Sequence, residues 1–335
     1  MSKILFIGFT TILLSGCAAV STSWNTAVDK ILTPEEVSAK YEKVVAGKIA
    51  EAAASAAPEE TLSKSLTKDV SKKLAATASE TIDGAISNSN TEISITGFEE
   101  SKPRYEILNV TGFMPSSDGH IQNFVQSSAL SASGRTTVNV GLGRRYLSAD
   151  EKFITGVNAF LDYDVEYGHQ RMSVGGELKS STLEFTANSY HGITSWKTGK
   201  DDNSERALSG YDVEVGAQIP FIPSAKFYLK RFEWDMYDAT DIKGTDYSLA
   251  FSHILSSGVG LEIGRRNYSG AQTDENFALF NYKVPLGANK DVTELPLFSS
   301  RMFENKSMKP KMLDKVRRNN AIVVQTKFTS SVGGV

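Results

Sequence analysis

Two aspartates, Asp162 and Asp164, come closest in this sequence to a catalytic pair. Two carboxylates on one face can share a proton and act as general acid and base. Both lie in the run from Gly156 to Tyr167, where apolar and polar side chains alternate. Strand side chains point alternately to opposite faces, so this run predicts a strand with one apolar and one acidic face. Because carboxylates on such a face more often pair with cations, we interpret the two aspartates as ion-pair partners.

A second candidate cluster consists of His169, Arg171 and Glu177, which bracket a predicted turn. Three other histidines are scattered without the spacing of metal ligands: His120, His191 and His253. No serine or cysteine nucleophile has a histidine at recognisable spacing. The sequence therefore predicts no catalytic, cofactor-binding or metal site.

The N-terminus has the layout of a secretory signal. Lys3 precedes an apolar run over residues 4–14, and small residues follow up to Cys17. This run is too short to span a bilayer, which takes about 20 apolar residues. Residues 14–17, Leu-Ser-Gly-Cys, resemble a bacterial lipobox, and Cys17 as the only cysteine cannot form an internal disulfide. We therefore predict a lipoprotein signal peptide over residues 1–16 and lipidation of Cys17. The alternative is an ordinary signal peptide that is cleaved near Ala19.

The composition excludes two classes of protein. Beyond the signal no apolar run reaches the length of a membrane-spanning helix. The net charge of −3 gives no basic excess of the kind that indicates a nucleic-acid partner.

Residues 17–91 differ from the rest of the chain and are rich in Ala, Ser, Lys and Glu. Thr33 can cap a helix that has Pro34 at its first position. A second helix is predicted after Pro58, where four apolar residues stand four apart: Leu62, Leu66, Val70 and Leu74. We predict a short, lipid-anchored periplasmic helical segment that serves as a spacer or plug.

From residue 104 the alternating pattern recurs twelve times. The predicted strands are 104–113, 120–130, 135–147, 153–167, 170–180, 182–194, 206–219, 225–236, 244–256, 259–269, 275–286 and 320–328. A similar run at 92–98 leaves an additional strand open. The polar faces carry many charges of both signs, which would be costly in a small dry core. The pattern therefore favours an all-β, twelve-stranded antiparallel outer-membrane β-barrel with a wet lumen over a soluble sandwich.

Several sequence motifs resemble one known family. They are NVGLGRRYL (139–147), GVNAFLDYD (156–164), HQRMSVGGE (169–177), ANSYHG (187–192), ERALSGYD (205–212) and RRNNAIVV (317–324). Together they resemble the β-domain of the inverse autotransporters, the intimin/invasin family. The resemblance implies a twelve-stranded barrel over residues 92–328 in the bacterial outer membrane, preceded by a periplasmic helical segment. It also implies an anchor that helps to export a C-terminal passenger of adhesin repeats. The sequence departs from the family in that no peptidoglycan-binding LysM pattern is evident.

The resemblance and the alternation place residues 320–328 as the last barrel strand, paired with the first. Its final aromatic, Phe328, resembles the signal that the barrel-assembly machinery recognises. We accordingly expect residues 329–335 to be a short periplasmic tail, too short to display an adhesin domain, so that loops would make any surface contact.

The stretch 301–318 is rich in cations: Arg301, Lys306, Lys309, Lys311, Lys315, Arg317 and Arg318. We interpret this stretch as a long, solvated loop. The alternative is that its cations touch outer-membrane lipid and lipopolysaccharide phosphates, since clustered cations bind anionic head groups.

These features predict a non-enzymatic barrel that acts in cell-surface adhesion or envelope organisation, with loops that reach a host or cell-surface receptor. The alternatives are an outer-membrane barrel enzyme, such as a phospholipase, and a small pore.

Overall fold

The computed structural model describes residues 89–99, 101–252, 258–286 and 298–327. The predicted signal peptide, Cys17, the helical segment up to residue 88 and the tail 329–335 lie outside these residues. No helix within the described ranges is long and apolar enough to cross a membrane.

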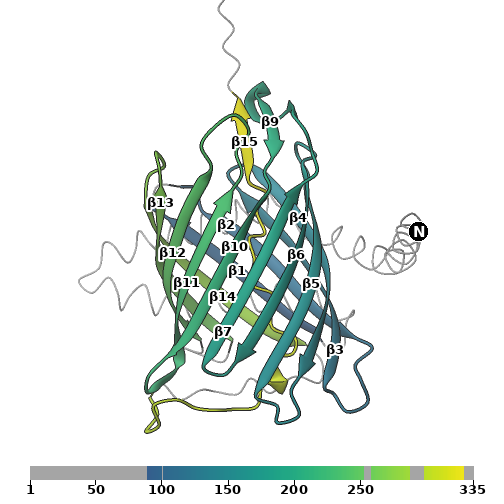
Figure 1. Cartoon of the computed structure of the whole chain (residues 1–335), viewed down its shortest axis with the longest axis vertical. Helices are drawn as coiled ribbons and strands as arrows, with labels where there is room; N and C mark the ends of the chain where they lie inside the picture. Colours follow the sequence, from purple (N-terminus) through teal and green to yellow (C-terminus); the bar gives the residue numbers. More distant parts are fainter. Residues whose placement is uncertain (1–88, 100, 253–257, 287–297, 328–335) are drawn as a thin grey trace, which may run out of the picture. The chain divides into compact units, whose positions relative to one another are not determined.

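Twelve antiparallel strands close into a barrel (Figure 1). They are β1 (Ser89–Phe98), β2 (Arg104–Phe113), β3 (Ile121–Ala132), β4 (Arg135–Leu147), β5 (Phe153–Asp164), β6 (Gln170–Ser180), β7 (Leu183–Gly192), β10 (Gly210–Ile219), β11 (Ile222–Trp234), β12 (Ile242–Ser252), β13 (Val259–Ser269) and β14 (Glu275–Leu286). β1 pairs with β2 on one side and with β14 on the other. Closure leaves no unpaired strand edge, which a bilayer would not tolerate.

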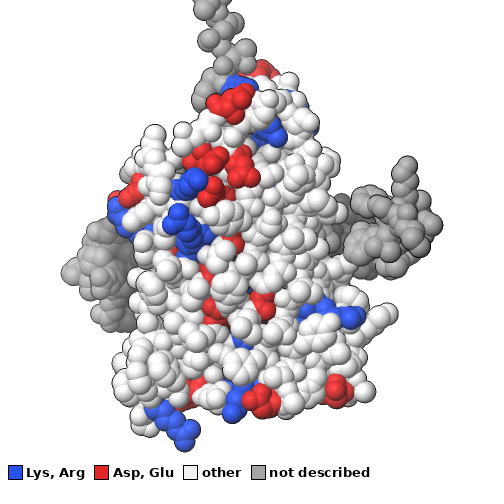
Figure 2. All heavy atoms as spheres, viewed as in Figure 1, with Lys and Arg blue, Asp and Glu red and all other residues white. Residues whose placement is uncertain are grey.

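The two faces of each strand have the predicted character, and β5 shows this most clearly. Val157 and Leu161 point outward and are 60% and 51% exposed, whereas Asn158 and Asp162 point into the lumen and are buried. Most of the outer flank is uncharged, with charged atoms in the upper part, along the lower rim and in scattered patches between them (Figure 2). The apolar face therefore faces lipid and the polar face lines the lumen.

The two ends of the barrel differ in their connections. At the end where β1 begins, the strands are joined by residues 114–120, 148–152, 181–182, 220–221 and 253–258. At the other end the connections include the longest one, residues 193–209, which holds β8 (Lys197–Thr198), the 3-10 turn η2 (Lys200–Asp202) and β9 (Ser204–Ala207). Because outer-membrane barrels have short periplasmic turns and longer extracellular loops, this second end, at the top of Figure 1, is the extracellular one.

The predicted number of barrel strands is confirmed, but one strand was assigned wrongly. The run at 92–98 belongs to β1, whereas the described part of the predicted strand 320–328, residues 320–327, forms no barrel strand. β14 pairs directly with β1, so the barrel is closed before residue 298 is reached. β15 (Val324–Lys327) instead pairs with β9 in a three-stranded sheet with β8, at the extracellular end.

Candidate functional site

The most distinctive feature of the lumen is the chain that runs through it. After β14 the described chain resumes at the periplasmic end, where Met308 donates its backbone N–H to the Glu151 carbonyl (2.7 Å). At the extracellular end Leu208 donates to the Val323 carbonyl (2.9 Å), and β15 follows. Residues 308–323, which we call the lumenal segment, thus cross the whole barrel (Figure 1).

The first part of the lumenal segment is held by apolar packing. Met308 and Met312 pack with Leu147 and Ile154 of the wall. A second cluster joins Leu313 and Val316 to four wall residues: Leu108, Val110, Phe124 and Phe160. These side chains are almost fully buried, so this part of the lumen is dry.

Wall side chains satisfy the backbone of the lumenal segment. Since this chain forms only the short 3-10 turn η3 (Lys309–Lys311) and joins no sheet until β15, most of its N–H and C=O groups need other partners. Arg145 donates to the carbonyls of Met312 (2.9 Å) and Asp314 (2.6 Å), and Arg171 donates to that of Asn319 (2.7 Å). Further contacts come from three wall residues: Asn90 to the Leu313 carbonyl, Asn188 to the Arg317 carbonyl, and Gln126, which accepts from the Val316 N–H.

Arg318 is the most deeply buried cation of the lumenal segment. Its guanidinium donates to Asp162 Oδ2 at 2.7 Å, and Arg171 donates to the same oxygen at 2.8 Å. The three side chains are fully buried. Two cations that share one carboxylate away from water form a tight network, and removal of Asp162 would leave both buried cations without their shared counter-charge.

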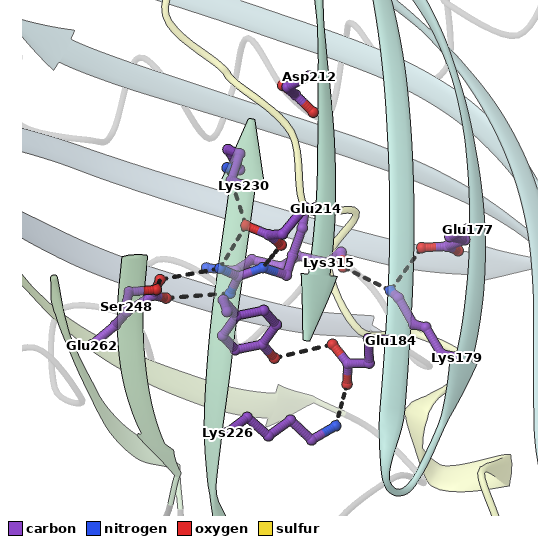
Figure 3. Close-up of polar contacts among 12 residues, drawn as sticks. Glu177, Lys179, Glu184, Asp212, Glu214, Lys226, Lys230, Ser248, Glu262 and Lys315 are labelled. Carbon is purple, nitrogen blue, oxygen red and sulfur yellow. Dashed lines mark hydrogen bonds and ion pairs between the residues drawn. The ribbon is translucent and has the colours of Figure 1, made fainter. Parts of the chain in front are cut away.

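Arg317 points toward the opposite wall. It bridges Glu214 of β10 and Glu262 of β13, with 3.1 Å between its Nη2 and Glu262 Oε1. Figure 3 shows these two carboxylates approaching from different strands, with Lys230 also near Glu214. Lys315 pairs with Glu92 of β1. Three nearby cations of one segment therefore bind acids on widely separated strands, which fixes the segment along the barrel axis.

The other side of the lumen contains a cavity of about 450 Å³. It is lined by the upper halves of β10–β14, β1 and β2 and by the lumenal segment, and it reaches Gln272 in an extracellular turn. Its wall includes Arg104, which stacks on Phe98, and Arg266, which makes two hydrogen bonds of 2.8 and 2.7 Å to Asp246. The cavity is lined by both aromatic and charged side chains, and the charged ones make it suitable for water.

At the extracellular mouth Glu205 of β9 holds the emerging chain to the barrel rim. This carboxylate is buried, pairs with Arg135 and lies 3.3 Å from His169 Nε2. Burial lowers the pKa of His169, so this ring is neutral at neutral pH. β9 in turn pairs with β15 along four residues. The exit of the lumenal segment is therefore fixed as firmly as its path.

The structure separates the residues that the sequence offered as catalytic pairs. Asp162 pairs with Arg171 and Arg318, whereas Asp164 pairs with Arg135 (2.8 Å). The interpretation of both aspartates as ion-pair partners is confirmed. The second candidate cluster is dispersed, since Glu177 pairs with Arg145 and Lys179 rather than with His169. Within the described ranges no group of three or more His, Cys, Asp or Glu side chains could hold a metal ion.

The expected basic loop is divided between two places. Arg301, Lys306 and Lys309 lie at the periplasmic end, whereas Lys315, Arg317 and Arg318 are paired with lumen acids. The residues that hold the lumenal segment were therefore missed as a site. The available signal was the run of polar residues 317–320, RRNN, which breaks the alternation that a lipid-facing strand requires.

Comparison with known proteins agrees with this architecture. A putative attaching and effacing protein homolog of Escherichia coli K12 is 30% identical over 138 residues, which cover 41% of this chain and 46% of the relative. Invasin of Yersinia enterocolitica is 31% identical over 32% of this chain and 13% of its own length. The inverse autotransporter adhesin YeeJ of Escherichia coli K12 is 23% identical over 57% of this chain and 8% of its own length. The chain thus spans less than half the length of each of these relatives.

A solved membrane protein from work on in-meso crystallization superposes with a TM-score of 0.61, at 19% identity, over 71% of this chain and 99% of that chain. At this identity the likeness shows the fold alone. The sequence model of the inverse autotransporter β-domain matches residues 44–320, which is most of the chain. The protein therefore belongs to the inverse autotransporter β-domain family and lies in the bacterial outer membrane.

Proposed function

We propose that this barrel is a non-enzymatic surface anchor, which holds the lumenal segment across the outer membrane and presents the chain after Lys327 outside the cell. The observation that carries this function is the threaded segment itself, fixed at Glu151 near the periplasmic end and at β9 near the extracellular end. Relatives named invasin and adhesin support a role of the presented chain in adhesion.

The geometry favours an anchor over an enzyme. The His120 ring bonds to the Leu147 carbonyl, the His169 ring bonds to Glu205, and His191 is exposed on the lipid-facing side of β7. These three described histidines therefore do not form a pair with a hydroxyl nucleophile. Most lumen carboxylates are paired with cations, whereas Asp212 accepts hydrogen bonds from Asn188 and Tyr190, and Glu106 accepts one from Asn320. A phospholipid-hydrolysis assay of the purified barrel should therefore give no turnover above that of a lipid blank.

The orientation of the chain can be tested on intact cells. An epitope tag after Val335 should be accessible to antibody without permeabilisation, because β15 lies at the extracellular end. This outcome reverses the expectation from sequence, which placed the tail in the periplasm. The matched control is the same tag after Ser117, in the periplasmic turn 114–120, which should react only after permeabilisation. The reverse pattern of labelling would refute the proposed orientation.

A further inference from the structure

The chain follows the periplasmic rim before it enters the lumen. Ser299 donates to the Phe221 carbonyl (2.9 Å), and Phe221 donates to the Met302 carbonyl (3.0 Å). Further along, the Lys306 N–H bonds to Ser181 Oγ (3.4 Å), before Met308 reaches Glu151. Residues 298–307, the rim segment, thus pass the β10–β11, β6–β7 and β4–β5 turns in order (Figure 1).

Four large apolar side chains are exposed where the rim segment meets the β10–β11 turn. Phe298, Met302 and Phe303 are 69%, 51% and 46% exposed, and Phe221 is 49% exposed. These fractions lie within or above the range of large apolar side chains on the lipid-facing strands, such as Val174 at 62% and Leu161 at 51%. Soluble surfaces seldom expose such a group together, so a contiguous apolar patch of this kind marks an interaction surface.

The backbone of Phe221 gives a second, independent indication. Its φ is +64°, a left-handed conformation that is an outlier for a bulky residue. Both of its main-chain polar groups bond to the rim segment, so the rim segment holds this strained turn. Strain of this kind concentrates where a structure serves a function.

The charges beside the patch indicate which partner it fits. Arg301 is exposed between the apolar residues, whereas Lys306 is paired with Glu304 of the same segment (2.9 Å), so Arg301 is the cation available to a head group. Apolar side chains next to cations match a membrane interface, where the former reach the acyl boundary and the latter the head groups. The patch also continues a lipid-facing surface, since Leu183 at the periplasmic end of β7 is exposed to lipid.

We propose that the patch formed by Phe221, Phe298, Met302 and Phe303 inserts into the inner leaflet of the outer membrane, with Arg301 at the phospholipid head groups. The rim segment is then a membrane-interface anchor that fixes the chain just before it turns into the lumen. This assignment depends on which end of the barrel is periplasmic, and it does not require that the lumenal segment present anything at the cell surface.

Membrane depth at single positions tests the proposal. The full chain with Cys17→Ser is reconstituted into phosphatidylethanolamine/phosphatidylglycerol vesicles, and a nitroxide is attached to Phe303→Cys, Met302→Cys or Phe298→Cys. Relaxation by oxygen, which partitions into lipid, is compared with relaxation by a water-soluble nickel chelate. Leu183→Cys is the lipid-facing reference, and Ser117→Cys, exposed in a turn at the same end, is the aqueous reference.

The oxygen-to-nickel ratio at the patch should approach that of Leu183 and exceed that of Ser117 severalfold. Arg301→Glu should lower the ratio at Met302→Cys in these anionic vesicles, whereas Lys102→Glu at the extracellular end should not. Ratios equal to that of Ser117 at all three patch positions would overturn the proposal. Such ratios would indicate that the patch faces water and is instead a binding surface for another protein.

Discussion

The two sides of the lumen hold the same segment in different ways. On the packed side, lined by β3–β7, the side chains of Arg145, Arg171 and Asp162 have no exposure, and all three hydrogen-bond to the lumenal segment. On the cavity side, lined by β10–β14 and β1, the side chains of Lys230 and Arg266 are 21% and 19% exposed. The packed side resembles a protein core, and the cavity side resembles a wet channel wall.

This difference separates two tasks of the lumen. Buried charge networks are costly when broken, so the packed side determines where the lumenal segment rests. Partly hydrated ion pairs contribute less to the free energy of unfolding, so breaking one of them costs less stability. The cavity side can therefore neutralise the cations of the segment and still leave space in the barrel.

Removal of the lumenal segment should have the largest effect. Deletion of residues 308–327 empties the packed side but leaves β1 paired with β14, so the barrel should still insert into membranes. Its conductance in a planar bilayer should rise severalfold over that of the complete chain, because water replaces the segment. Deletion of residues 89–98 is the control, since it opens a strand edge in lipid and should abolish insertion. Failure of the first variant to insert would show that the segment is needed for assembly.

Two adjacent arginines compare the two sides directly. Arg318→Met removes one partner of a fully buried ion pair with Asp162, together with its hydrogen bonds to Ser173 and Asn320, and should cost about 3–5 kcal/mol of unfolding free energy. Arg317→Met removes a side chain that is 18% exposed and faces the cavity, where water can solvate Glu214 and Glu262. We expect less than half the loss for this variant, measured as urea unfolding of the reconstituted barrel. Equal losses would mean that the two sides do not differ in hydration.

Larger side chains placed in the lumen should reveal a smaller difference in stability between the packed side and the cavity side. Asn158 on the packed side faces Gly175, and a Cβ atom placed at that glycine would lie 2.7 Å from Asn158 Oδ1. Asn158→Arg should therefore overpack the lumen and cost about 1–3 kcal/mol. Thr96→Arg projects into the cavity and should change stability by less than about 0.5 kcal/mol. Urea unfolding measures the stability of both variants. A larger loss for Thr96→Arg than for Asn158→Arg would mean that the free space does not lie on the cavity side.

The sequence predicted the barrel wall well because alternation is a local signal. The inward position of Asp162 and the outward position of Leu161 follow from their parity within one strand. Which strand closes the barrel is not a local property of the sequence. Residues 92–98 and residues 320–328 both alternate, so either could have been the strand that completes the barrel. Only the pairing of β1 with β14 decides between them.

The site was harder to predict than the wall. Asp162 was recognised as an ion-pair partner, but Arg318 lies 156 residues away in the chain, in a stretch that was interpreted as a surface loop. A threaded segment needs no periodicity, because the wall supplies its hydrogen bonds at irregular intervals. Its path depends on the shape of the lumen, which no single segment of the sequence encodes.

The smallest expected effect concerns the point where the chain enters the packed side. A hydrogen bond from Ser307 (2.6 Å) and then the nearby Lys309 lower the pKa of Glu151 in the β4–β5 turn. A carboxylate with a lowered pKa stabilises the folded state above its unfolded pKa, about 4.3, and this contribution is lost as the pH falls through the lowered value. Carboxyl NMR titration of the micelle-embedded protein should therefore show Glu151 titrating below that value. Ser307→Ala should return it toward the usual range, whereas Ser117→Ala, in another turn at the same end, should not. A Glu151 pKa that is unchanged by Ser307→Ala would mean that the rim segment is not fixed at this turn, and that the packed side begins further inside the barrel.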